Sequence, residues 1–131
     1  MAKVLIAGTV DVASDARDQA LRDARPLIDE ALGEPGCLAY AWTCDPFEPG
    51  RIHVFEEWES EQTLGEHLRA PSYLRMLAHL GRVGIRSAVT RKYRVDREEP
   101  VYDETGTPRG DFSTEGPDET DGHRRSLRTE R

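Results

Sequence analysis

The amino-acid sequence predicts an α+β domain of the ferredoxin-like type, in which a βαββαβ chain forms an antiparallel sheet with helices on one face. Three observations predict this fold class. Four segments of the chain have strand patterns, the first as an apolar run and the others with residues that alternate between two faces. Between the first two segments, and again before the last, apolar residues recur at helical spacing. Glycine and proline residues mark most of the connections.

The first strand and helix occupy the N-terminal third of the domain. Residues 3–10 are mainly Val, Leu, Ile, Ala and Thr, which favours a strand. Ser14 or Asp15 is expected to cap the helix that follows, and Gly33 to end it. Pro26 predicts a kink or a restart inside this helix. Its apolar positions are Ala20, Leu21, Ala24, Leu27, Ile28, Ala31 and Leu32.

The next two strands form a predicted hairpin around the proline- and glycine-rich residues 45–50. In its two arms, every second residue shares one face of the sheet. On that basis one face of the first arm carries Leu38, Tyr40, Trp42 and Cys44. One face of the second arm carries Ile52, Val54, Glu56 and Trp58.

A broken helix and a last strand complete the predicted domain. Ser60 can cap a helix that Pro71 stops, and Ser72 can cap a second short helix. Residues 87–95 predict the fourth strand, with one of its faces formed by Val89, Arg91, Tyr93 and Val95. A four-stranded sheet with helices on one face leaves its other face uncovered. We therefore expect a symmetric homodimer.

The sequence changes character after residue 96. We expect residues 1–96 to form the folded domain and residues 97–131 to be an acidic, mostly flexible tail, because the tail has few large apolar residues. The alternative is an arm that lies on the dimer partner and is anchored by Val101, Tyr102 and Phe112.

Composition and charge exclude several classes of function. The formal net charge of −7 argues against binding to nucleic acid or to an anionic membrane surface. No apolar run approaches a membrane span of roughly 20 residues, and the N-terminus does not resemble a signal peptide. These features predict a cytoplasmic protein. Cys37 and Cys44 are expected to be free thiols, because on one strand they would lie too far apart for a bridge.

Motifs for metal ions and nucleotide cofactors are missing from the sequence. The four histidines lack the HxxxH and HxH spacings of metal ligands, so we expect no metal site. There is no GxGxxG after a strand, no P-loop and no GxSxG. We therefore expect no nucleotide cofactor and no serine hydrolase chemistry.

Two stretches resemble the antibiotic biosynthesis monooxygenase superfamily: residues 34–40 (EPGCLAY) and residues 55–60 (FEEWES), followed by His67-Leu68 and Pro71-Ser72-Tyr73. The resemblance covers roughly residues 3 to 95. It implies a dimeric α+β barrel with a pocket between sheet and helices in each subunit. It also implies oxygenation without metal or flavin, in which a deprotonated phenolic substrate supplies the electron that activates O2.

Several positions depart from the oxygenases of that superfamily. Val54, Leu64 and Leu77 stand where a polyketide-oxidising member has asparagine, tyrosine and arginine, so only Trp58 matches that catalytic set. The haem-degrading branch expects an asparagine near Gly8 and a histidine near Leu77, and neither is present at those positions.

The candidate catalytic residues are His67, Glu56 and Trp58. A neutral His67 could accept a phenol proton near neutral pH, or it could be a packed core histidine. Glu56 could serve as a base with a raised pKa, or pair with Arg91 or Arg94. The Trp58 indole could stack on an aromatic ligand or pack in the core. The candidate substrate contacts, which could equally be core or interface residues, are Tyr40, Trp42, Val54, Leu64, Tyr73 and Leu77.

The leading functional hypothesis is a cofactor-independent monooxygenase that acts on a small aromatic phenol or quinol with O2. One alternative is an isomerase or cyclase that uses the same pocket. The other is a non-catalytic binding or assembly protein, in which the acidic tail recruits a partner.

Overall fold

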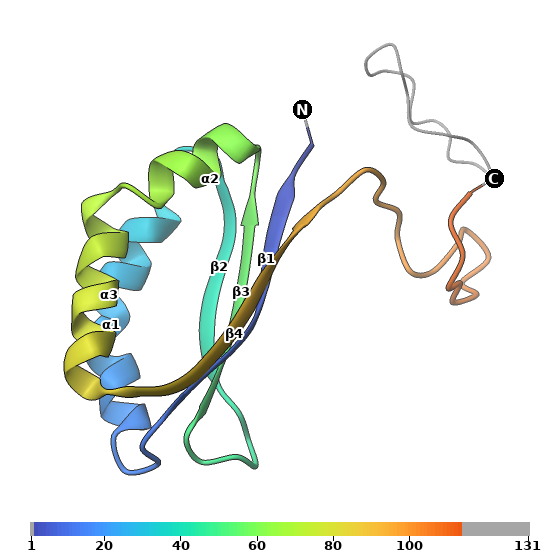
Figure 1. Cartoon of the computed structure of the whole chain (residues 1–131). Coiled ribbons are helices and arrows are strands. Elements are labelled where there is room, and N and C mark those ends of the chain that lie inside the picture. The colour runs from blue at the N-terminus through green and yellow to red at the C-terminus, as the bar shows by residue number, and fades with distance from the viewer. Residues whose placement is uncertain (1, 114–131) are drawn as a thin grey trace. The chain divides into compact units, whose positions relative to one another are not determined.

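The structure is a computed structural model that describes residues 2–113 (Figure 1). The chain divides into two compact units, of which the first ends at Val95 and the second begins at Asp96. Seven helices and strands, all in the first unit, follow one another along the chain. They are β1 (Val4–Val12), α1 (Arg17–Leu32), β2 (Cys37–Cys44), β3 (Arg51–Trp58), α2 (Glu61–His67), α3 (Pro71–Val83) and β4 (Ile85–Arg94).

The ferredoxin-like prediction is confirmed. The four strands form one antiparallel sheet in the order β2-β3-β1-β4, and the helices lie on one side of it (Figure 1). α1 packs on β2, and α3 packs on α1. As predicted, the second helix of the βαββαβ chain is broken into two pieces, α2 and α3.

The helix-facing side of the sheet carries the core. In β3 every second residue is buried, as its sequence pattern predicts: Ile52, Val54, Glu56 and Trp58. Small residues of α1 face them, and Ala20, Ala24 and Ala31 are buried there. One core cluster forms around Trp58, where Ala31 packs on the sheet, and a second forms around Ile52 and Val54. Trp58 and Ile52 are completely buried.

The predicted start of α1 is wrong. The helix begins at Arg17, and its N-cap residue is Ala16, which has no side-chain acceptor. The residues before it form a turn in which the Ala16 N–H donates to the Ala13 carbonyl, so neither Ser14 nor Asp15 reaches the cap position. Pro26 lies within a continuous helix, so the predicted restart is also wrong.

The two other predicted caps have opposite outcomes. Ser60 caps α2, with its hydroxyl accepting from the Thr63 N–H while the Thr63 hydroxyl accepts from the Ser60 N–H. Ser72 does not cap α3, because Pro71 occupies the first turn and Ala70 is the N-cap residue. The buried Ser72 hydroxyl instead donates to a glutamate of another element, Glu34.

The prediction for Leu38 is also wrong. The pairing of β2 with β3 shifts between Cys37 and Ala39, which is the signature of a β-bulge. Cys37 therefore lies opposite Trp58 and packs against the core, whereas Leu38 is 49% exposed. Beyond the bulge the alternation holds, with Tyr40 opposite Glu56.

β4 is exposed along its whole length in the single chain. It begins at Ile85, two residues before the predicted start, and pairs with β1. The side of the sheet that faces away from the helices carries exposed apolar side chains on several strands, among them Phe55, Val89 and Tyr93.

The described part of the second unit, residues 96–113, contains a small hairpin. Tyr102 pairs with Pro108, and the Asp103 carboxylate accepts from the N–H groups of Thr105 and Thr107 in the turn between them. The three residues proposed as anchors, Val101, Tyr102 and Phe112, are exposed. The predicted flexibility and the alternative of an arm on a partner stay predictions, and residues 114–131 lie outside the described part.

No helix within residues 2–113 combines the length and apolar character needed to cross a membrane.

Candidate functional site

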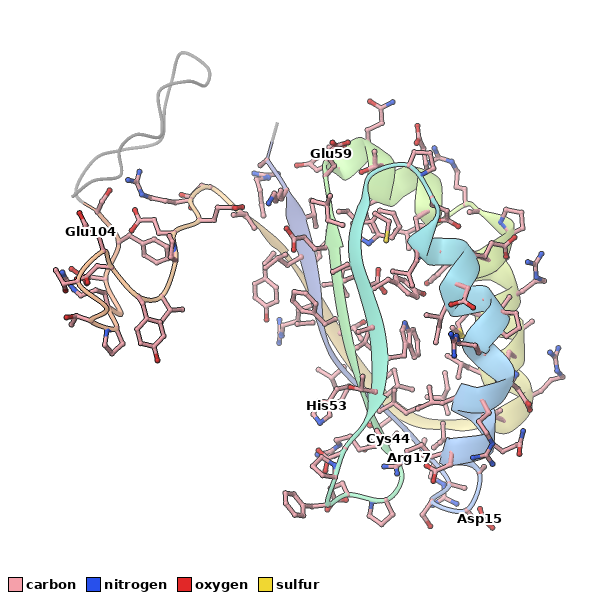
Figure 2. All side chains as sticks on the ribbon, turned by 180° about the vertical axis from the view of Figure 1, so that it is seen from behind. Asp15, Arg17, Cys44, His53, Glu59 and Glu104 are labelled. Carbon is pink, nitrogen blue, oxygen red and sulfur yellow. The ribbon has the colours of Figure 1, made fainter. Side chains whose placement is uncertain are left out.

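A group of aromatic and titratable side chains gathers between the sheet and the helices, and we call it the His67 cluster. Side chains fill the layer between β2, β3 and the helices (Figure 2). The cluster lies at the end of that layer where β3 ends and α2 begins. Its members are Glu34, Tyr40, Trp42, Glu56, Trp58, His67, Ser72 and Tyr73.

Strand register and helix ends bring these residues together. Tyr40 and Glu56 are direct partners across β2 and β3, so their side chains point to the same side of the sheet. His67 is the last residue of α2, whose orientation the Ser60 cap helps to fix. The break between α2 and α3 turns the first residues of α3, Ser72 and Tyr73, toward it.

His67 is surrounded by aromatic rings. Its imidazole is only 2% exposed and stacks on the Trp58 indole, with ring centroids 4.5 Å apart and an interplanar angle of 28°. The rings of Tyr40 and Tyr73 meet the imidazole edge-on, at 5.5 Å and 5.4 Å. The structure thus brings together four of the candidate residues, Tyr40, Trp58, His67 and Tyr73.

A carboxylate holds one nitrogen of this histidine. His67 Nδ1 lies 2.6 Å from Glu34 Oε1, and the Ser72 hydroxyl donates to Glu34 Oε2 at 2.5 Å. An ionised carboxylate can only accept, so Nδ1 must carry a proton. In a neutral imidazole the other nitrogen, Nε2, is then an unprotonated acceptor. Nε2 is buried and has no hydrogen-bond partner within residues 2–113.

Glu56 is a buried carboxyl beside the same histidine. Burial raises its pKa above the usual range, while the hydrogen bond from Trp58 Nε1, at 2.9 Å, opposes the rise. The alternative ion pairs are wrong. Arg94 pairs with Glu61 at 3.0 Å, and Arg91 lies on the sheet side that faces away from the helices.

Tyr40 and Trp42 line the same side of β2. Burial, reinforced by the nearby Glu56, raises the pKa of the Tyr40 hydroxyl well above its usual range. The Trp42 indole N–H lies near that hydroxyl and partly offsets the rise. The two groups do not make a regular hydrogen bond, and the buried Trp42 Nε1 has no partner in the described chain.

The remaining predicted substrate contacts differ in burial. Val54 and Leu64 are buried in the core beside the cluster, and Leu77 is 47% exposed on α3. Contact of any of the predicted residues with a substrate stays a prediction.

Glu34 and Ser72 are the members of the cluster that the sequence did not predict. Glu34 precedes Pro35-Gly36, so its position in the sequence is typical of a turn residue. The only signal in the sequence was His67 itself, because a buried histidine needs a polar partner for a ring nitrogen.

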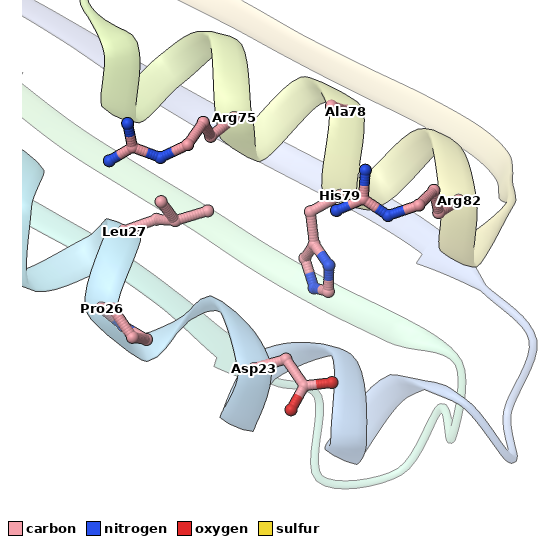
Figure 3. A pocket seen from close by; sticks show the side chains of 7 residues that line it. All are labelled: Asp23, Pro26, Leu27, Arg75, Ala78, His79 and Arg82. Atoms are coloured by element: carbon pink, nitrogen blue, oxygen red, sulfur yellow. The ribbon is translucent and has the colours of Figure 1, made fainter.

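The structure also has a hollow of about 390 Å³ on the other flank of α3, where α3 meets α1 (Figure 3). Among its lining residues, His79 donates from Nε2 to the Ala20 carbonyl, 2.9 Å away. None of the predicted site residues lines this hollow. It is formed by Asp23, Pro26, Leu27, Arg75, Ala78, His79 and Arg82.

Within residues 2–113, no group of three or more His, Cys, Asp and Glu side chains is arranged to hold a metal ion. Cys37 and Cys44 are both free thiols, as predicted.

Comparison with known proteins supplies the family. The profile of the antibiotic biosynthesis monooxygenase family matches residues 4–79, which include every member of the His67 cluster. The chain belongs to this family. The match includes residues 34–40 and 55–60, the two segments whose resemblance was noted in the sequence, and these carry Glu34, Glu56 and Trp58.

Solved structures related to this family member share its fold at low sequence identity. A Deinococcus radiodurans protein named for antibiotic biosynthesis monooxygenase superposes with a TM-score of 0.68 at 18% identity, covering 75% of this chain and 97% of that one. Rv0793 from Mycobacterium tuberculosis gives a TM-score of 0.65 at 23% identity, covering 75% and 99%.

A sequence relative comes from Synechocystis. The uncharacterized protein sll1783 is 26% identical over 70 residues, which are 53% of this chain and 48% of that protein. The matched part of this chain thus spans about half the length of that relative.

Proposed function

We propose that this protein is a cofactor-independent monooxygenase that oxidises an electron-rich aromatic phenol or quinol with O2. The observation that carries the proposal is the buried, unpartnered Nε2 of His67, whose other nitrogen is held by Glu34. Membership of the antibiotic biosynthesis monooxygenase family makes oxygenation the first chemistry to test.

The first step is removal of a proton. The phenolic O–H of the substrate donates its proton to Nε2, and His67 becomes an imidazolium. Glu34 stabilises that cation at 2.6 Å, and Ser72 orients the carboxylate through its second oxygen. Because the imidazole is buried among Trp58 and two tyrosines, water does not compete for this proton.

The second step uses the electrons of the deprotonated substrate. The phenolate transfers one electron to O2, and the resulting radical and superoxide combine at a ring carbon. When a ring CH2 becomes a carbonyl, one oxygen atom enters the product and the other leaves as water with the two hydrogens. In this mechanism Trp58 and Tyr73 hold the aromatic ring, and Glu56, with its raised pKa, is an alternative proton acceptor.

The protein is proposed to act in the cytoplasm as a homodimer. Support comes from the apolar side chains that Phe55, Val89 and Tyr93 expose on the side of the sheet without helices. Such a face is stabilised by a second copy related by two-fold symmetry.

An anthrone is a suitable first substrate, because its ring CH2 is conjugated through the aromatic rings to the carbonyl opposite, so that loss of a CH2 proton to His67 gives a phenolate-type anion. We expect conversion to the quinone in air and none without O2. His67→Gln should slow conversion by about 10²-fold or more, whereas substitution of a histidine outside the cluster, His53→Gln, should not. Equal conversion by the His67→Gln variant, or none by the wild type in air, would reject the proposal.

An isomerase or cyclase is the second candidate. Proton transfer by His67 does not itself require O2, and Val54, Leu64 and Leu77 replace polar residues of a polyketide-oxidising relative. Turnover of an enolisable aromatic ketone that depends on His67 but proceeds at the same rate without O2 would identify this chemistry instead.

A further inference from the structure

The hollow between α1 and α3 shares no residue with the His67 cluster. Its volume of about 390 Å³ is within the range of small-molecule binding pockets. Three of its lining residues come from α1 and four from α3, where they recur every three or four positions along one face of the helix (Figure 3). The two helices therefore offer a second place for a small molecule, separate from the proposed catalytic residues.

Part of the hollow is apolar. The Pro26 ring and the Ala78 methyl group are exposed there, and the half-buried Leu27 packs against the core cluster that contains Met76. Covering such a surface with an apolar side chain or ring removes it from water and is favourable.

The two arginines of the hollow differ in their partners. Arg75 forms an ion pair with Glu30, whereas Arg82 makes no hydrogen bond or ion pair within residues 2–113. A guanidinium carries its donors in a planar fork that fits a carboxylate. Arg82 can therefore bind a carboxylate of a ligand without giving up an existing partner.

His79 offers an acceptor on the same face of α3 as Arg82. Its Nε2 donates to the Ala20 carbonyl of α1 at 2.9 Å, which holds the ring between the two helices (Figure 3). In a neutral ring Nδ1 is then unprotonated, and it has no partner in the described part of the chain. A ligand in the hollow can donate a hydrogen bond to this nitrogen.

Asp23 supplies a second acceptor, from the opposite helix. Its Oδ1 accepts from Gln19 Nε2 at 2.7 Å, and its Oδ2 has no partner among residues 2–113. The hollow is thus bordered by a carboxylate on α1 and by the unpaired Arg82 guanidinium on α3. A ligand with only a negative charge is repelled by Asp23, and one with only a positive charge is repelled by Arg82.

We propose that this hollow binds a free amino acid with an aromatic or large aliphatic side chain. The carboxylate of the ligand binds Arg82, and its ammonium group donates to Asp23 and to Nδ1 of His79. Its side chain covers the apolar surface of Pro26 and Leu27. A zwitterion fits this arrangement because it carries both charges close together and brings no net charge. The inference does not depend on the proposed chemistry of the His67 cluster.

Isothermal titration calorimetry with three related ligands tests the site. L-phenylalanine carries both charged groups, 3-phenylpropanoate lacks the ammonium group, and 2-phenylethylamine lacks the carboxylate. We expect the wild type to bind L-phenylalanine with a Kd of about 1 mM or lower. Each of the two analogues should bind about fivefold more weakly or worse, which is the effect of one ion pair at an exposed site.

Two charge-removing variants assign the ligand groups to their partners. Arg82→Gln should weaken binding of L-phenylalanine and 3-phenylpropanoate about fivefold and should not weaken binding of 2-phenylethylamine. Asp23→Asn should weaken binding of L-phenylalanine and 2-phenylethylamine by a similar factor and should not weaken binding of 3-phenylpropanoate. Both side chains are exposed, so the variants should fold as the wild type does.

The matched controls are Asp29→Asn on α1 and Arg69→Gln after α2, which remove the same charges from exposed residues that do not line the hollow. Neither should change the affinity for L-phenylalanine more than twofold. The proposal is overturned if the wild type does not bind L-phenylalanine or binds all three ligands equally. It is also overturned if the controls lose as much affinity as the Arg82 and Asp23 variants, or if those two variants bind L-phenylalanine as the wild type does.

Discussion

Two histidine–carboxylate pairs of this protein have the same contact distance and very different surroundings. His67 Nδ1 and Glu34 Oε1 are 2.6 Å apart, and so are His53 Nε2 and Asp45 Oδ2. The side chain of His67 is 1% exposed and that of His53 is 48% exposed. His53 lies near the start of β3, beside the β2–β3 loop, and Glu59 follows the other end of that strand (Figure 2). Of the two pairs, only the one with Glu34 contains a buried histidine whose other ring nitrogen has no partner within residues 2–113.

A short distance between a histidine nitrogen and a carboxylate oxygen therefore does not by itself identify a functional site. At the loop, Asp45 also accepts from the N–H groups of Phe47 and Glu48, so its carboxylate stabilises a turn. In the cluster, Glu34 accepts from Ser72 and His67, which belong to two different helices. The second arrangement orients a side chain whose other nitrogen is left without a partner.

The largest expected effect is on activity, which substitution of His67 should lower far more than substitution of His53. Loss of a general base lowers rates by about 10²- to 10⁴-fold, so His67→Gln should reduce kcat/KM on an anthrone substrate by that factor. His53→Gln should change kcat/KM less than twofold. Steady-state kinetics in air measure both variants. Equal losses of kcat/KM in the two variants would contradict the role of His67 as the general base.

The second comparison concerns stability. Glu34→Ala leaves the buried Ser72 hydroxyl and His67 Nδ1 without their acceptor, and we expect a loss of about 2 kcal/mol or more in the free energy of unfolding. Asp45→Ala should shift the urea midpoint less, because its donors, the half-exposed His53 and the N–H groups of the exposed loop residues Phe47 and Glu48, can bond to water instead. An equal or larger shift for Asp45→Ala would contradict the assignment of Glu34 as the acceptor for two buried groups, His67 and Ser72.

The third comparison concerns pH. The pKa of Glu56 is raised in the folded state, so folding favours its protonated form and stability falls as pH rises above its usual value of 4.5. The pKa of Asp45 is lowered, so its contribution is present above its usual value of 3.8 and is lost as pH falls below it. Urea unfolding between pH 3 and pH 7 should show that Glu56→Gln removes the first trend and Asp45→Asn the second. Unchanged trends in the variants would assign the pH dependence to other groups.

The smallest effect concerns the two thiols, one at each end of β2. Cys37 packs against the core near the His67 cluster, and Cys44 is exposed next to the loop. A thiol reagent should therefore label Cys44 several times faster than Cys37, as mass spectrometry of partially labelled protein can measure. Faster labelling of Cys37 would show that the cluster end opens more readily than the loop end.

Local patterns predicted the fold and part of the site. Alternation along residues 51–58 placed Glu56 and Trp58 on the helix-facing side, and helical spacing placed His67 on the inward side of α2. Trp58, His67 and Tyr73 follow one another within a short stretch of chain, so their proximity depends on few long-range contacts.

Glu34 and Ser72 could not be predicted in this way. Glu34 is 33 residues from His67 and 38 residues from Ser72, and only the packing of α1, α2 and α3 brings the three together. Ser72 directly follows a proline at a helix start, where a cap is the usual local role of serine. A bulge in β2 likewise turned Leu38 outward, because a single shift in register reverses the face of a residue.

The protonation of the two nitrogens of His67 tests the central claim most directly. ¹⁵N NMR of the imidazole distinguishes a protonated nitrogen from an unprotonated one in the neutral ring. We predict that neutral His67 carries its proton on Nδ1, in the hydrogen bond to Glu34, and that Nε2 is unprotonated. A proton on Nε2 with a bare Nδ1 would leave His67 without a free acceptor nitrogen and would contradict its proposed role as the base.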